Sequence, residues 1–166
     1  MYRSIEDFIK DWEEETESTL KVIGALTDQT IREKVHPEVR SLERLAWHLT
    51  QSITEMGTRA GLFAADELEG TSPPAAIPEL MDTYKKYCGL LIKALRSKWT
   101  DSALADTTDM YGEPWEKGKV LRVLIAHQTH HRGQMTVIMR LLGLPVPGVC
   151  GPSKEEWAQF GMVAPE

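Results

Sequence analysis

The segment between Pro114 and Leu142 constrains the fold more than any other part of the chain. Its apolar residues recur at the spacing of one helix face, and it stops at Gly143 with Pro145 just beyond. Glycine at this position and proline shortly after it are the usual signals that end a helix. The segment therefore predicts one long helix over residues 114–142.

Three earlier segments, residues 4–26, 39–62 and 78–99, have the same helical periodicity. Pro78 suits the first position of the third segment, where its missing N–H costs nothing. The apolar residues that carry the three patterns are Ile5, Phe8, Ile9, Trp12, Leu20, Ile23 and Leu26, then Leu42, Leu45, Leu49, Ile53 and Met56, then Leu80, Met81, Tyr84, Cys88, Leu91 and Leu95. Four helices with no convincing strand predict an all-α fold, a four-helix bundle. All three connections are long, so the winding order of the helices stays open.

The remaining segments are rich in polar and turn-forming residues. EGTSPPAAIP reads as a loop, and TDSALADTTDMYGEPWEKG is too long and too polar for a simple turn. Near the C-terminus, Ser153 and Glu156 have the spacing of a capping box, which predicts one short final helix. The length of the chain predicts a single domain over residues 1–166.

Charge and composition exclude several classes of function. A net charge of −6 without a basic cluster argues against nucleic acid as a partner. No apolar run approaches the roughly 20 residues needed to cross a bilayer, and the acidic N-terminus lacks the apolar region of a signal peptide. Cys88 and Cys150 suit a reducing compartment as packed thiols, and the acidic run at residues 13–17 reads as a solvated helix face. We therefore expect a cytoplasmic protein that does not act at membranes.

The histidines are unevenly placed, because three of the five fall within residues 127–131. His127 and His131 are four residues apart, so they lie on one helix face, together with apolar residues of the inward stripe. His48 borders the inward stripe of its own helix at a comparable depth. We expect the three imidazoles to converge from two facing helices near the middle of the bundle. His130 is turned away from this stripe toward a helix interface, and His36 is expected in an exposed loop.

A bound metal would explain three imidazoles in the interior. A lone buried histidine is more often a hydrogen-bonded core residue, and burying imidazoles without partners costs roughly 1–3 kcal/mol each. Neutral imidazole is a good ligand for divalent transition metals. Three protein ligands leave coordination positions open, as in catalytic rather than structural zinc sites. A bound metal could lower the pKa of a coordinated water toward 7, or equally the pKa of a thiol.

The sequence offers no obvious general base. Glu55, seven residues after His48 on the same face, is the best candidate, although most helical glutamates are simply at the surface. Gln51 and Gln134 are candidates for groups that support the metal ligands.

Residues before the last helix are candidates for a pocket wall. Tyr111 and Glu113, with Trp115, would supply polar contacts to a substrate there. The alternative is that this segment only covers the end of the bundle.

The run from MYGEPWEKGKVLRVLIAHQTHHRGQM to GLPVPGVCGPSKEEW, with LAWHL in the second helical segment, resembles the DinB/YfiT family. The resemblance implies a four-helix bundle in which His48, His127 and His131 bind a divalent metal, zinc or nickel. The motif Arg132-Gly133-Gln134 also matches, and Gly133 is expected to let another helix approach closely.

The resemblance also implies a function, a metal-dependent enzyme. Some relatives transfer low-molecular-weight thiols to electrophiles, so a bacterial thiol S-transferase or a hydrolase is expected, with a small-molecule substrate. The alternative is a non-catalytic metal-binding stress-response protein. Relatives often form dimers, and apolar side chains outside a single stripe (Leu121, Ile125 and Val137) support a homodimer through helix faces.

Overall fold

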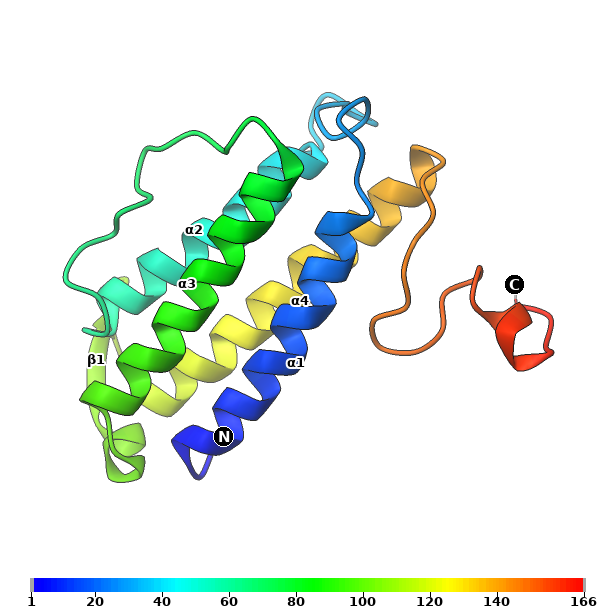
Figure 1. Ribbon diagram of the computed structural model, residues 1–166. Helices are drawn as coiled ribbons and strands as arrows, with labels where there is room; N and C mark the ends of the chain where they lie inside the picture. The colour runs from blue at the N-terminus through cyan, green and yellow to red at the C-terminus, as the bar shows by residue number, and fades with distance from the viewer. Residues whose placement is uncertain (1, 166) are drawn as a thin grey trace.

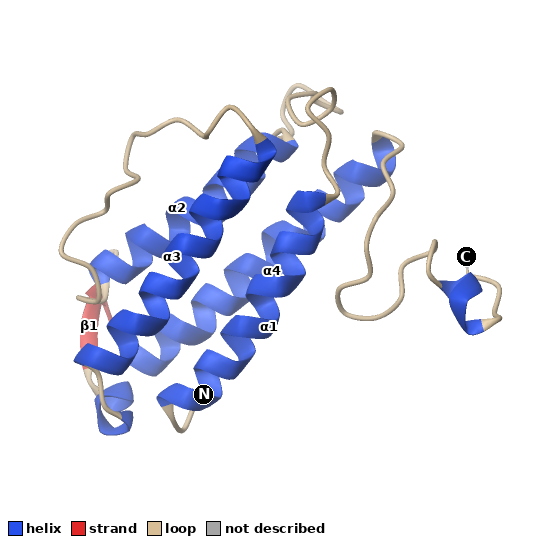
Figure 2. Ribbon diagram, in the orientation of Figure 1, coloured by secondary structure: helices blue, strands red, loops and turns tan. Residues whose placement is uncertain are grey.

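The computed structural model describes residues 2–165, and its framework is four long helices. These are α1 (Ile5–Gly24), α2 (Leu42–Arg59), α3 (Ile77–Lys98) and α4 (Lys117–Leu141). Within the described residues the one sheet pairs β1 (Thr107–Met110) with β2 (Glu113–Glu116), and a short 3-10 helix, η1 (Asp101–Ala105), precedes it (Figure 2). The all-α, four-helix prediction is confirmed.

Local sequence determines where the helices begin and end. The side chains of Ser4 and Ser41 accept hydrogen bonds from the backbone of the first turns of α1 and α2, and such caps each contribute about 1 kcal/mol. Pro78 lies in the first turn of α3. Gly143 follows α4 with a φ of 72°, a left-handed conformation that glycine adopts without strain.

The helices do not alternate in direction along the chain. Residues 60–76, between α2 and α3, travel back along the length of the bundle, so these two helices run in the same direction (Figure 1). Both α1 and α2 pack against α3 and α4. The arrangement makes α2 and α4 neighbours, and these are the two helices that carry the histidines.

The segment before α4 folds differently from the prediction. Residues 114–116 belong to β2, so α4 begins at Lys117 rather than Pro114. The hairpin closes through Tyr111 and Gly112, which both have positive φ angles (61° and 84°). Two-residue turns with positive φ match the twist of paired strands. Met110 is fully buried and anchors the hairpin to the core.

The predicted short final helix is present as a single 3-10 turn, η2 (Trp157–Phe160), and the tail that carries it lies to one side of the bundle (Figure 1). Two other predictions need correction. Cys88 is a packed thiol, but Cys150 is exposed. Glu15, in the acidic run, is buried instead of solvated. None of the described helices is both long and apolar enough to cross a membrane.

Candidate metal centre

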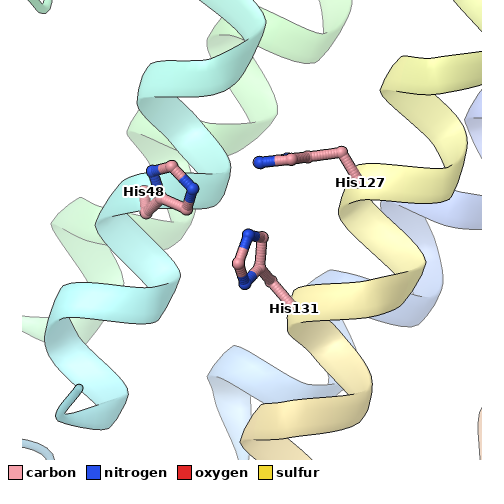
Figure 3. Close-up of side chains that lie close together, drawn as sticks. All are labelled: His48, His127 and His131. Carbon is pink, nitrogen blue, oxygen red and sulfur yellow. The ribbon is translucent and has the colours of Figure 1, made fainter. Parts of the chain in front are cut away.

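Three histidines from two helices point at one another (Figure 3). His48 projects from α2, and His127 and His131 project from successive turns of α4. The ring centroids are 4.9 Å apart for His48 and His127, and 4.6 Å apart for His48 and His131. One potential ligand nitrogen from each ring lies within 4.8 Å of the other two. We call these residues the three-histidine cluster.

The residue after His127 fixes this level of α4 against two other helices. Gln128 is fully buried, and its side-chain oxygen accepts a hydrogen bond from the Tyr84 hydroxyl of α3 at 3.1 Å. Its amide nitrogen donates to the carbonyl of Leu49 at 2.9 Å and to the Ser52 hydroxyl at 3.1 Å, both on α2. Both polar atoms of the Gln128 side chain are therefore hydrogen-bonded. These bonds fix the depth of the neighbouring His127 relative to α2.

A second buried network fixes α4 against α1. Arg132, the residue after His131, forms an ion pair with Glu15 and donates to the Thr19 hydroxyl at 3.2 Å. Thr129 donates to the same carboxylate at 3.2 Å. This network was not predicted from the sequence, although Glu15 and Thr19 both lie at helical spacing from Trp12. That spacing was the available signal.

Burial keeps the three imidazoles neutral. Burial, together with smaller contributions from the neighbouring His127 and His131, lowers the pKa of His48 to about 4. Burial likewise lowers the pKa of His127 to about 4, with a contribution from His131. The pKa of His131 is lowered by burial and partly restored by its hydrogen bond to Gln134. Neutral imidazoles keep the lone pair that a metal needs.

Gln134 orients one ligand. Its side-chain oxygen lies 2.8 Å from Nδ1 of His131, and its amide nitrogen lies 3.1 Å from Nε2 of His130. A carbonyl oxygen can only accept, so Nδ1 of His131 carries the proton and Nε2 keeps its lone pair. Gln134 therefore supports the cluster as expected. His130 is exposed and bonds within α4, so its predicted place at a helix interface is wrong.

The cluster has the composition and size to hold a divalent metal. Nitrogens at 2.0–2.1 Å from one tetrahedral ion are about 3.4 Å apart, so small ring rotations would bring the cluster to that spacing. Nδ1 of His127 is buried and has no hydrogen-bond partner among the described residues. An unpartnered buried polar atom costs about 1–3 kcal/mol. A metal bound through Nδ1 would give this atom the partner that the described residues do not supply.

A pocket of about 600 Å³ opens beside the cluster at His131. We call it the His131 pocket. Its lining residues are Val35, Glu38, Val39, Arg40, Leu45, His131, Gln134, Val137, Ile138 and Leu141. They come from the connection between α1 and α2, from the start of α2 and from the second half of α4. This volume is in the range of small-molecule sites. The sequence analysis did not identify the first connection as a pocket wall, because nothing in its local pattern shows which helix it covers.

The other predicted site residues gather at the far end of α2. Glu55 forms an ion pair with Arg59 at 3.3 Å, and the Arg59 guanidinium lies 4.6 Å from the centre of the Tyr111 ring. Burial raises the pKa of Tyr111, and the Glu55 carboxylate adds to the effect. Glu113 accepts a hydrogen bond from the indole N–H of Trp115 at 2.9 Å. None of these five residues lines the His131 pocket.

Other sequence expectations have mixed outcomes. Gln51 bonds to Arg44 at 2.8 Å and to the carbonyl of Leu68 at 2.9 Å, and neither partner is a histidine. Gly133 is exposed, and a Cβ there would meet nothing within 4 Å, so the expected close helix approach is wrong. His36 is exposed in the first connection, as predicted.

The three residues named as a dimer surface differ in their exposure to solvent. Leu121 is buried inside the bundle, and Ile125 is half-buried. Val137 is 60% exposed, and Leu141, one turn further along α4, is 66% exposed. Of the three residues named for the dimer, Val137 alone is exposed, and together with Leu141 it gives the last turns of α4 an apolar surface.

Comparisons with known proteins agree with the fold. Protein YrdA of Bacillus subtilis (strain 168) is 37% identical over 166 residues, which is 100% of this chain and 99% of the relative. The crystal structure of a DinB-like protein from Bacillus cereus ATCC 10987 is 39% identical with a TM-score of 0.79, and the match covers 90% of this chain and 99% of that one.

A more distant structure shares the fold alone. The DinB-like protein YjoA of Bacillus subtilis is 17% identical with a TM-score of 0.67, over 84% of this chain and 96% of that one. The model of the DinB family matches residues 1–165. This chain belongs to the DinB family.

Proposed function

We propose that the protein is a metal-dependent enzyme, in which His48, His127 and His131 hold a zinc or nickel ion. The observation that carries the proposal is the position of three neutral imidazoles beside an open pocket of about 600 Å³. A structural zinc site would be closed by a fourth protein ligand. When bound, the metal supplies Lewis acidity that lowers the pKa of a coordinated thiol or water.

Transfer of a small thiol to an electrophile is the reaction we favour. The thiol loses its proton to solvent, the thiolate sulfur forms a bond to the electrophilic carbon, the bond to the leaving group breaks, and the leaving group departs with the electron pair. Water is a much weaker acid than a thiol, so hydrolysis depends more on a group that accepts the proton. Among the residues that line the His131 pocket, Glu38 is the one carboxylate that could accept it. Hydrolysis is therefore the second candidate reaction.

The residues of the chain would position and protect the reacting sulfur. Gln134 holds the His131 ring in one tautomer, and the aliphatic side chains of the pocket, such as Ile138, would limit access of water. Catalytic roles for Glu55, Tyr111 and Glu113 remain predictions, and they require a substrate long enough to reach the hairpin.

Two further proposals concern assembly and location. We infer a homodimer that pairs through the exposed apolar side chains Val137 and Leu141 of α4. We place the protein in the cytoplasm, since its two free cysteines suit a reducing compartment.

The test combines metal analysis with turnover. Elemental analysis of the purified protein is expected to give one zinc or nickel per chain, and His127→Ala is expected to remove it. The loaded protein is then mixed with a small thiol and an aryl chloride, and loss of free thiol is measured against metal-free protein. One bound metal without any turnover of thiols or of ester substrates would support the rival function, a metal-binding stress-response protein. Absence of metal binding at saturating zinc and nickel would overturn both.

A further inference from the structure

The His131 pocket contains a positively charged side chain, Arg40, that is not one of the proposed metal ligands. Arg40 lines the pocket together with His131, and it comes from the connection between α1 and α2 rather than from α4. After burial and the neighbouring histidines, the positive charge of Arg40 is a further cause of the lowered pKa of His48 and His127. Its guanidinium is thus close enough to affect the cluster electrostatically.

Arg40 has no carboxylate partner within residues 2–165, unlike the other arginine of the same connection. Arg32 is paired with Glu43 at 2.7 Å. Glu38 also lines the pocket, but it forms no ion pair with Arg40 in the described part of the chain. The guanidinium is therefore available to a ligand.

The backbone next to Arg40 is held by local hydrogen bonds, and the Arg40 side chain is exposed. Arg40 directly precedes Ser41, the residue that caps α2. The connection before it is braced by the bond from the Val39 amide to the His36 carbonyl (3.0 Å) and by the bond from Lys34 to the Pro37 carbonyl (3.2 Å). A braced backbone reduces the entropy that is lost when the side chain binds a ligand.

Apart from Glu38 and Gln134, the rest of the pocket lining is aliphatic. It includes Val35, Val39, Val137, Ile138 and Leu141. The geometry points to a ligand with three parts, namely a metal-binding group at the cluster, an apolar body, and an anionic group held by Arg40. We propose that the substrate is an anionic, carboxylate-bearing small molecule and that Arg40 determines this specificity. This inference rests on the proposed metal centre only for the metal-binding group of the ligand. The anionic group is argued from Arg40 alone.

The test uses three probes that differ only in their end group. Binding of hexanoate, hexanol and hexylammonium to the full-length protein is measured by calorimetry and by amide chemical shifts, with and without added zinc. We expect hexanoate to bind most tightly, and we expect shifts at residues 35–40 and at the end of α4. A charge-assisted hydrogen bond is worth about 1.5–3 kcal/mol, so Arg40→Gln should weaken hexanoate binding about 10-fold or more and leave hexanol binding unchanged.

Matched variants test whether hexanoate binding depends on Arg40 itself or on the overall charge of the surface. Arg32→Gln removes the same charge from the same connection outside the pocket, and it should leave hexanoate binding unchanged. Glu38→Gln should strengthen it by removing a repulsive carboxylate. Equal hexanoate binding by wild type and Arg40→Gln, or tighter binding of hexylammonium than of hexanoate, would overturn the proposal.

A fourth probe distinguishes failure of the metal centre from failure of the anion site. Nickel-loaded protein is titrated with 6-mercaptohexanoate, and thiolate coordination is followed by its charge-transfer absorbance. If hexanoate binding depends on Arg40 but the thiol gives no such band, the proposed thiol chemistry fails and the anion site stands. At limiting 6-mercaptohexanoate, the charge-transfer band should be weaker in Arg40→Gln than in wild type. Equal bands in the two proteins would contradict a role for Arg40.

Discussion

The Arg132 guanidinium of α4 and the Glu15 carboxylate of α1 form a buried ion pair one residue after His131. Both side chains are almost completely removed from solvent. The pair therefore joins two helices directly beneath a member of the three-histidine cluster. Because buried charges are tolerated only with partners, the pair also restricts how α4 can rotate or slide against α1.

Removing one partner of this pair should be strongly destabilising. Arg132→Met leaves the Glu15 carboxylate buried and unpaired, which typically costs about 3–5 kcal/mol. The free energy of unfolding, from urea denaturation, is expected to fall by that amount. Arg96→Met is the control, since Arg96 pairs with Glu6 at the surface, and loss of an exposed pair costs at most about 1 kcal/mol. A double variant, Arg132→Met with Glu15→Leu, should recover much of the loss; equal losses in the two single arginine variants would contradict the structural role of the pair.

This ion pair also illustrates what could be predicted from the sequence. The helices and the direction of the histidines follow from local spacing, and both predictions agree with the structure. The burial of Glu15 does not follow from local spacing alone, because it depends on Arg132, which is 117 residues away in the sequence. The spacing of Glu15 from Trp12 places it on the apolar face of the helix, but nothing local shows that a buried partner meets it there.

The same reason explains the other differences. The hairpin before α4 uses Tyr111 and Gly112 as its turn residues, and tyrosine is not among the residues that usually signal such a turn. The wall that Arg40 contributes to the His131 pocket depends on how α2 and α4 pack, and the long connections hide that arrangement. Long-range packing, rather than local preference, decides each of these features.

Gln134→Leu should weaken metal binding without unfolding the protein. The change removes the acceptor that holds Nδ1–H of His131, and loss of such an orienting partner typically costs about 10–100-fold in metal affinity. Zinc affinity is measured by competition with a chelator. Gln51→Leu is the matched control, because Gln51 bonds to Arg44 and to a backbone carbonyl instead of a histidine. If both variants lose the same affinity, the orienting role of Gln134 is wrong.

The proposed homodimer predicts that a charge at the end of α4 separates the subunits. Leu141 is 66% exposed in the single chain, so Leu141→Glu should be harmless to folding and unfavourable in an apolar interface. Light scattering at micromolar concentration is expected to give a dimer for wild type and a monomer for the variant. Ala158→Glu, in the tail, adds the same charge outside α4 and should leave the dimer intact. A monomeric wild-type protein would rule the interface out.

The metal-free protein should lose stability as the pH falls from about 6.5 toward 4. Burial holds the pKa of His48 and of His127 at about 4 in the folded state, whereas an unfolded chain has histidine pKa values near 6.5. Between these values the unfolded chain binds more protons, so the free energy of unfolding decreases with decreasing pH. Above about pH 6.5 neither state binds these protons, and this contribution is constant.

The carboxylates of the chain also titrate near the lower end of this range, so a variant is needed to isolate the histidines. Urea denaturation of chelator-treated protein is compared at pH 7 and pH 5 for wild type and for the combined His48→Gln, His127→Gln and His131→Gln variant. Wild type is expected to lose more stability between the two pH values than the variant, because only wild type contains the three imidazoles whose pKa values are lowered in the folded state. Bound zinc should oppose the loss at pH 5, since a metal ligand must be neutral. An identical pH dependence in the two proteins would show that the imidazoles are not held neutral by burial.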